Sequence, residues 1–221
     1  MQNGHIFTFA GQAMIARPSG ALFWPAEELL VVSDLHLGKS ERISRRGGAL
    51  LPPYEVQDTL IRLEADIAAT LPRAVICLGD SFDDMAAVTA LDPDHANWIA
   101  GLTAGRDWTW VTGNHDPAPT GLGGHAADVV TCGPVTFRHI AIAGTSPEIS
   151  GHYHPKASLR VRGHAVSRPC FLRDDMRLIL PAYGTYTGGM RTSDRALGQL
   201  MAANARAILA GLPMVEIPMP R

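Results

Sequence analysis

The chain has 221 residues, of which 46% are hydrophobic and 18% are charged. This balance excludes an intrinsically disordered protein and a coiled coil, because both need a larger charged or polar fraction. The formal net charge of −2, from 19 basic and 21 acidic residues, excludes a uniformly basic nucleic-acid-binding domain but leaves room for a local basic patch. The length fits one domain over residues 1–221, since α/β domains often run to about 200–250 residues.

The first half of the sequence alternates strand patterns with helix patterns. Three strands are predicted at the start, over residues 5–10, 13–17 and 21–24. Apolar runs predict three further strands, buried on both faces, at 29–34, 74–80 and 108–116. Helices are predicted between them, at 54–70 and 94–103. This alternation favours crossover connections and a largely parallel sheet.

The second half has shorter apolar runs and closely spaced Gly and Pro residues. A β-hairpin is predicted around Gly133 and Pro134. Further strands are predicted at 148–155, 157–163 and 177–184, a short helix at 193–201, and a terminal hairpin at 206–218. We therefore expect an α/β protein in which a meander of antiparallel strands follows the parallel part.

The three cysteines, Cys77, Cys132 and Cys170, form no CxxC pair and no plausible disulfide framework. Free thiols are typical of proteins in a reducing cytoplasm. No apolar run approaches the roughly 20 residues that a membrane span needs. The first residues also lack the basic and then apolar pattern of a signal peptide. We expect a cytoplasmic protein whose mature form is the whole chain.

Polar side chains follow each of the three buried strands. The first strand leads to Asp34 and His36, the second to Asp80, and the third to Asn114 and His115. Ligands bind beyond the carboxyl ends of strands in open α/β sheets, so these side chains should meet at one edge. Later strand patterns add three more candidates, namely His139, His152 and His154. Oxygen and nitrogen donors without a thiolate suit two divalent cations rather than a structural cysteine–zinc site.

Five sequence pieces stand in a fixed order: D-x-H at 34–36, G-D at 79–80, G-N-H-D at 113–116, the lone His139, and G-H-x-H at 151–154. In this order they resemble the calcineurin-like metallophosphoesterase superfamily. The strings DLHLGK, LGDSF, GNHDP, SGHYHP, RPCF and LPAYGTYTGG are further similar to the bacterial ligase-associated metallophosphoesterases, over roughly residues 5–190. The resemblance implies a four-layer α/β/β/α sandwich and a metal-dependent phosphodiesterase.

The resemblance also implies a ligand set for two metals. Asp34, His36 and His154 would bind the first metal, and Asp80 would bridge both. The second metal would be completed by Asn114, His139 and His152. His139 is preferred over His125 because it ends a strand pattern, whereas His125 follows a glycine-rich segment. Mn²⁺ is the expected ion, and the same donors accept Fe, Zn, Co or Ni.

The mechanism implied by this ligand set is in-line attack on phosphorus by a hydroxide that bridges the metals. Two metals about 3.5–4 Å apart lower the pKa of a shared water toward neutrality. His115 would not bind metal but would face the scissile phosphate and assist the leaving group. Asp116 is expected to orient His115 through its other ring nitrogen.

Two further features concern the substrate. The basic residues after the first metal loop form either a phosphate-binding patch for DNA or a solvated face; they are Lys39, Arg42, Arg45 and Arg46. Tyr183 and Tyr186 are either base-stacking residues or half-buried strand residues. Asp83 stands where ligase-associated proteins often have a histidine. Its charge is unfavourable near a phosphodiester unless the carboxylate faces away or pairs with an arginine.

The resemblance implies a single-strand DNA endonuclease or phosphodiesterase that acts in DNA repair, in association with a DNA ligase, a helicase and an exonuclease. A small-molecule phosphatase or a cyclic-nucleotide phosphodiesterase is the alternative enzyme. Only about 23 residues separate His115 from His139, and this missing cap insertion argues against a selective small pocket. The alternative outside the enzymes is a non-catalytic metal-binding scaffold. Measuring metal content and activity together would distinguish such a scaffold from an enzyme.

Overall fold

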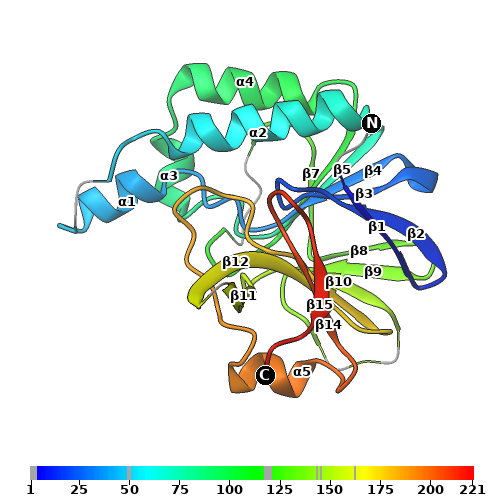
Figure 1. Cartoon of the computed structure of the whole chain (residues 1–221). Coiled ribbons are helices and arrows are strands. Elements are labelled where there is room, and N and C mark those ends of the chain that lie inside the picture. The colour runs from blue at the N-terminus through cyan, green and yellow to red at the C-terminus, as the bar shows by residue number, and fades with distance from the viewer. Residues whose placement is uncertain (1–3, 49–50, 117–120, 143, 145, 162) are drawn as a thin grey trace.

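The computed structural model describes residues 4–48, 51–116, 121–142, 144, 146–161 and 163–221. Its elements form four layers, in which two facing β-sheets lie between helices (Figure 1). This arrangement confirms the α/β/β/α sandwich that the sequence predicts.

The first sheet contains, in the described part of the chain, seven strands in sequence order: β1 (His5–Phe9), β2 (Gln12–Ala16), β3 (Leu22–Trp24), β4 (Leu29–Val32), β5 (Ala74–Leu78), β6 (Asp107–Val111) and β7 (His125–Ala127). Strands β1 to β4 pair antiparallel. Strands β4 to β7 pair parallel. Strand β7 is not predicted from the sequence, because it has three residues and follows a glycine-rich segment.

Two long helices, α2 (Glu55–Thr70) and α4 (Pro93–Thr103), cover the outer face of the first sheet (Figure 1). Their buried residues, which include Leu60 and Ile99, pack against apolar side chains of β4 and β5. The shorter helices are η1 (Pro25–Glu27), α1 (Lys39–Arg45) and α3 (Met85–Thr89). None of the described helices is long and apolar enough to cross a membrane.

The second sheet runs in the order β15-β14-β12-β13-β10-β9-β8, with β11 paired to β12. Its strands are β8 (Val129–Cys132), β9 (Val135–Arg138), β10 (Glu148–Ser150), β11 (Lys156–Val161), β12 (His164–Arg173), β13 (Arg177–Ile179), β14 (Arg206–Leu209) and β15 (Glu216–Pro218). Strand β10 pairs parallel with both β9 and β13. The expected antiparallel meander is therefore wrong for the centre of this sheet. The ten-residue strand β12 is also not predicted from the sequence.

The two sheets hold the apolar core between them. Phe137, Ile149 and Phe171 of the second sheet pack against Met14 and Val31 of the first. On the other face of the second sheet, the short helix α5 (Arg195–Leu200) buries Leu197 against Cys170 and Leu172. The three cysteines are free thiols, as the sequence predicts.

Glu216 on β15 joins the two sheets at their edge. Its Oε1 accepts hydrogen bonds from Arg173 and Arg206 Nε, both at 2.9 Å, and its Oε2 lies 3.1 Å from His5 Nε2 on β1. Burial raises the pKa of Glu216, but the charge and hydrogen bond of Arg173, with those of His5 and Arg206, outweigh it and hold the pKa below its usual value of 4.5. The stabilisation by ionised Glu216 is thus complete above pH 4.5 and is lost as the pH falls through the lowered value.

We predict that Glu216→Gln lowers the free energy of unfolding by about 1–2 kcal/mol at pH 7, because a neutral amide binds the two arginines less strongly. Urea unfolding of both proteins from pH 7 to pH 3 measures this difference. It should shrink below pH 4.5, where Glu216 of the unfolded wild type becomes protonated, and should be lost as the pH falls through the lowered pKa of the folded protein. A difference that persists undiminished at pH 3 would show that the contribution is not ionic.

Candidate metal centre

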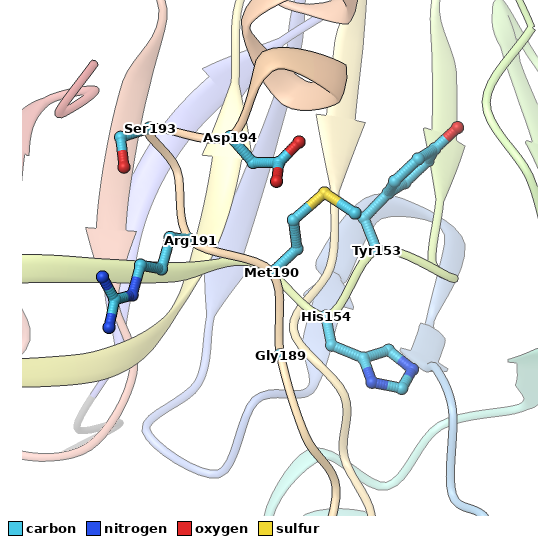
Figure 2. A pocket seen from close by; sticks show the side chains of 7 residues that line it. All are labelled: Tyr153, His154, Gly189, Met190, Arg191, Ser193 and Asp194. Atoms are coloured by element: carbon cyan, nitrogen blue, oxygen red, sulfur yellow. The ribbon is translucent and has the colours of Figure 1, made fainter.

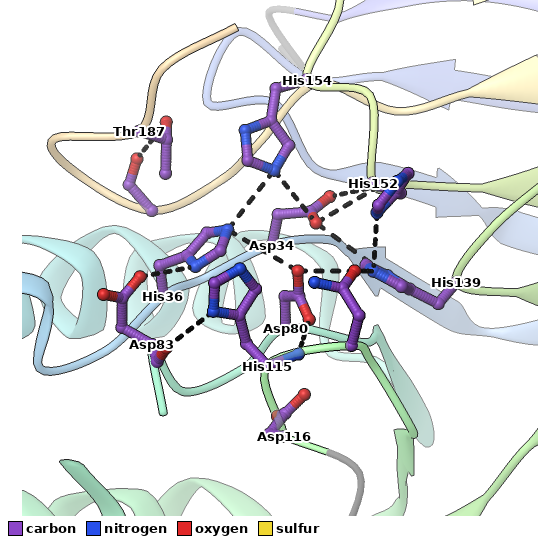
Figure 3. Close-up of polar contacts among 12 residues, drawn as sticks. Asp34, His36, Asp80, Asp83, His115, Asp116, His139, His152, His154 and Thr187 are labelled. Carbon is purple, nitrogen blue, oxygen red and sulfur yellow. Dashed lines mark hydrogen bonds and ion pairs between the residues drawn. The ribbon is translucent and has the colours of Figure 1, made fainter. Parts of the chain in front are cut away.

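Strands of both sheets end at the same place. The parallel strands β4, β5 and β6 lead into loops that carry Asp34 and His36, then Asp80, then Asn114. The parallel strands β9 and β10 lead into His139 and into the G-H-Y-H segment 151–154. Figure 3 shows the labelled side chains of these loops turned toward one another. All seven residues that the sequence predicts as metal ligands are brought together here.

The donor atoms form two main groups. The first group is Asp34, His36 and His154, in which Asp34 Oδ1 and His36 Nε2 lie 3.1 Å and 3.4 Å from His154 Nε2. The second group is Asp80, His139 and His152, in which His152 Nδ1 and Asp80 Oδ2 lie 3.2 Å and 3.4 Å from His139 Nε2. Asn114 belongs to the second group, since its Oδ1 is 3.0 Å from His139 Nε2.

Asp80 lies between the two groups. Its Oδ2 is 3.4 Å from His139 Nε2 and 4.0 Å from His36 Nε2, while its Oδ1 accepts a hydrogen bond of 2.8 Å from the His115 main-chain N–H. Burial raises the pKa of Asp80, but the hydrogen bond and charge of His139 outweigh it and hold the pKa at about 2. Asp80 therefore remains an anion in the position that a bridging ligand needs.

The hydrogen bonds of three histidines decide which ring nitrogen faces the site. His139 Nδ1–H donates to the Leu78 carbonyl at 2.8 Å, and His115 Nδ1–H donates to the Asp83 carbonyl at 2.8 Å. His36 Nδ1–H donates to the Asp83 carboxylate at 2.9 Å. A carbonyl or a carboxylate only accepts, so each neutral ring keeps its lone pair on Nε2. These bonds orient the rings as metal-binding histidines are usually oriented.

The arrangement of acceptors fits a cation. In the neutral ring His139 Nε2 carries a lone pair that faces the acceptor atoms Asp80 Oδ2 and Asn114 Oδ1, and His152 Nδ1 lies beside it. Burial lowers the pKa of His139, but Asp80 and Asp34 outweigh it and raise the pKa above its usual value. Burial and the charge of His139 together lower the pKa of His152, which favours a neutral His152 ring beside His139. The separations of 3.0–3.4 Å suit donors that share one ion at about 2.0–2.2 Å.

The backbone holds the predicted ligands in an uncommon conformation. In the described part of the chain nine non-glycine residues have positive φ, and five of them, with φ between 44° and 69°, are Asp34, His36, Asp80, His152 and His154. A left-handed backbone conformation costs free energy in a non-glycine residue, and such conformations concentrate at functional sites. Asp and His adopt the left-handed region more readily than most residues do. Loop-to-loop bonds maintain it, because the N–H of His36 donates to the Asp80 carbonyl at 2.9 Å.

Two glycines of the motifs are required by close packing. A Cβ on Gly151 would lie 1.7 Å from Ser33 Oγ and 2.5 Å from Asp34 Oδ2. A Cβ on Gly113 would lie 2.2 Å from the Asp80 main-chain nitrogen. Side chains at these positions would displace both carboxylates. The glycines of G-H-x-H and G-N-H-D therefore leave the space that Asp34 and Asp80 occupy.

His125 lies apart from the cluster. It begins β7, its side chain is 59% exposed, and its Nε2 is 3.0 Å from Thr109 Oγ1. His139, by contrast, is 5% exposed and contacts both Asp80 and Asn114. Of these two candidates, the structure brings His139 to the other predicted ligands.

Asp116 does not orient His115, and that expectation is wrong. The Asp116 Oδ2 accepts hydrogen bonds from the main-chain N–H groups of Ser81 (2.8 Å) and Phe82 (3.2 Å). It therefore fixes the loop after Asp80 instead. Burial raises the pKa of Asp116 to about 7 despite these two bonds. The His115 ring is held by the carbonyl of Asp83, which the sequence motifs do not reveal.

Asp83 contacts two histidines of the site. It is fully buried, binds His36 through its carboxylate and His115 through its carbonyl, and pairs with Arg42 and, at 3.5 Å, with Lys39 Nζ. Burial raises the pKa of Asp83, but the hydrogen bond of His36 and the charges of Lys39 and Arg42 outweigh it and hold the pKa at about 2. Asp83 therefore pairs with an arginine, which is one of the two conditions under which its charge is compatible with a nearby phosphodiester.

The predicted basic patch is largely paired within the protein. Lys39 and Arg42 contact Asp83, and Arg45 contacts Glu41 and Asp84. The fourth member, Arg46, is exposed at the end of α1.

The two candidate stacking residues differ in exposure. Tyr183 is 1% exposed, and its hydroxyl donates to Asp66 Oδ2 at 2.8 Å, so it is a core residue. Tyr186 is 37% exposed. Of the two rings, that of Tyr186 is therefore the one accessible to a substrate.

We predict that Asp83→Ala weakens Mn²⁺ binding about 10–100-fold, because His36 loses the acceptor that fixes its ring. Titration of the metal-free protein with Mn²⁺, followed by electron paramagnetic resonance, measures the affinity. Asp84→Asn is the matched control, since Asp84 caps α3 and asparagine caps equally well. Wild-type affinity in Asp83→Ala would show that Asp83 does not position His36.

The chain is similar to proteins that cleave phosphate esters. Residues 28–171, more than half of the chain, match the family described as calcineurin-like phosphoesterase. The solved structure of a nuclease from Pseudomonas putida, MPE, is 28% identical, with a TM-score of 0.76 over 97% of this chain and 100% of that one. Yfce, a phosphoesterase from E. coli, is 11% identical, with a TM-score of 0.42 over 87% of this chain and 99% of that one, which is too distant for inference. No curated protein matches the chain.

Proposed function

The chain belongs to the calcineurin-like phosphoesterase family and is a metal-dependent phosphoesterase, and we propose that it cleaves phosphodiester bonds of single-stranded DNA. The observation that carries this proposal is the pair of donor groups with Asp80 between them and His115 beside them. The similarity to a protein named as a nuclease supports a nucleic acid as the substrate.

The donor groups define which residues would hold each ion. Asp34, His36 and His154 would hold one, Asn114, His139 and His152 the other, and Asp80 both. Two divalent ions at such a site, with Mn²⁺ the expected ion, activate water for attack and neutralise charge on the phosphoryl oxygens. The protein supplies fixed positions, because hydrogen bonds hold the His36 and His139 rings from behind. Main-chain N–H groups bind the carboxylates of Asp34 and Asp80.

His115 is the proposed acid for the leaving oxygen. Its Nδ1 proton is bound to the Asp83 carbonyl, so the proton that can be transferred is the one on Nε2. Its ring contacts the edge of the His36 ring, with centroids 5.2 Å apart, which places it beside the first donor group. Imidazole is the side chain that most often transfers a proton in enzymes.

The charge around Asp83 favours an anionic substrate. One buried carboxylate faces the two cations Lys39 and Arg42, so the group carries a net positive charge. The whole protein has a net charge of −2 and does not attract DNA by itself. We infer that the segment Lys39–Arg46, together with the bound ions, supplies the local attraction for the phosphate backbone.

The cellular role is inferred from the motifs. The strings that resemble ligase-associated metallophosphoesterases support a role in DNA repair, and the free cysteines fit a reducing cytoplasm. A DNA ligase, a helicase and an exonuclease are then the expected functional partners. Comparing single-stranded DNA with duplex DNA, cyclic nucleotides and phosphomonoesters, with Mn²⁺ at fixed salt, tests the substrate class.

We predict that His115→Ala lowers kcat for single-stranded DNA about 10²–10⁴-fold while the metal content stays at the wild-type level. The loss should be smaller for bis-p-nitrophenyl phosphate, because p-nitrophenolate leaves without a proton. Elemental analysis and initial rates measure both quantities. His125→Ala, which removes an exposed histidine from β7, is the matched control and should keep its activity.

Full turnover of DNA by His115→Ala would exclude the acid role of His115. Inactivity of the wild type with each of Mn²⁺, Fe²⁺, Co²⁺ and Ni²⁺ would contradict the proposed activity itself.

A further inference from the structure

A cavity of about 600 Å³ adjoins the first donor group. It is lined by Tyr153, His154, Gly189, Met190, Arg191, Ser193 and Asp194 (Figure 2). His154 is shared with the site, since its Nε2 lies 3.1 Å from Asp34 Oδ1. A substrate whose phosphate lies at the donor groups therefore has this cavity immediately beside it.

The walls of the cavity are already in place. The Met190 N–H donates to the carbonyls of Tyr153 and His154, both at 3.2 Å, and the Lys156 N–H donates to the Met190 carbonyl at 2.8 Å. These main-chain bonds fix the segment 189–191 against the G-H-Y-H loop. Binding here would cost little ordering of the protein.

The surfaces of the cavity suit a flat aromatic group. The half-buried Tyr153 ring and the Met190 thioether form its apolar part. Aromatic rings and thioethers both make favourable contacts with the face or edge of another ring. In Figure 2 the Asp194 carboxylate is turned toward Tyr153, whereas the Arg191 guanidinium extends to the other side of the segment.

Asp194 is exposed and lines the cavity with its carboxylate. Its Oδ1 accepts a hydrogen bond of 2.9 Å from the Ala196 N–H, and within the described part of the chain no partner binds its Oδ2. A carboxylate that faces the cavity repels a phosphate but accepts an N–H donor. Cytosine and adenine present such a donor in their exocyclic amines, whereas thymine presents a carbonyl oxygen in that place.

We propose that this cavity binds the nucleoside next to the scissile phosphate and prefers cytosine or adenine over thymine. The inference rests on the proposed phosphodiesterase activity and adds a base preference to it. Tyr153 and Met190 contact the base, and Asp194 accepts its exocyclic amine. The preference then arises from the single free carboxylate oxygen at the rim.

The test compares the Mn²⁺-loaded wild type with two variants on single-stranded oligo(dC), oligo(dA) and oligo(dT). Bis-p-nitrophenyl phosphate, which has no base or sugar, is the reference substrate. The wild type should show a kcat/KM about tenfold higher for oligo(dC) and oligo(dA) than for oligo(dT), as expected for one hydrogen bond to a charged acceptor. Asp194→Asn should bring the three values together, because an amide also donates to thymine O4, and asparagine still caps α5.

Ser193→Trp fills the cavity from its exposed rim. Its kcat/KM for oligo(dC) should fall about tenfold more than its kcat/KM for bis-p-nitrophenyl phosphate. Ser167→Trp, at an exposed position of β12 outside the cavity, is the matched control and should keep the wild-type ratio. Equal rates on the three oligonucleotides, or an unchanged ratio in Ser193→Trp, would overturn this inference alone. A wild type that hydrolyses neither DNA nor the reference substrate would overturn the proposed function as well.

Discussion

Acceptor groups that face one another are the constraint on which the rest of this structure depends. Asp80 Oδ2 and Asn114 Oδ1 lie 3.4 Å and 3.0 Å from His139 Nε2, and a similar group surrounds His154 Nε2. Buried lone pairs and carboxylates without a positive partner are costly. Bound cations would remove that cost. The hydrogen bonds behind the His36 and His139 rings fit such ions, because they leave the Nε2 of each neutral ring directed inward.

The fold brings these groups together through parallel strands in both sheets. In the first sheet β4, β5 and β6 deliver three loops to one edge. In the second sheet the parallel pair β9 and β10 delivers His139 and His152 to the same edge. The cost of this convergence is visible in the left-handed backbone of five candidate ligands, and it is tolerated because neighbouring loops bond to each other.

Much of this arrangement can be predicted from the sequence, because its signals are local. The apolar runs before Asp34 and Asp80 predict their strands, and the ordered motifs predict the residues that meet. The direction of β10 and the pairing of β7 and β12 are set by the neighbouring strands of each sheet, so the pattern within each segment does not reveal them. Asp116 is misjudged for the same reason, since the Asp83 carbonyl that holds His115 belongs to another loop.

The central claim is that the two donor groups bind two metal ions with Asp80 between them. Anomalous diffraction from crystals of the Mn²⁺-loaded protein tests it most directly. The account predicts two manganese peaks, one against Asp34, His36 and His154 and the other against Asn114, His139 and His152, with Asp80 touching both. A single peak beside Asp83 and His115, where a third group of donors lies, or no bound manganese, would contradict it.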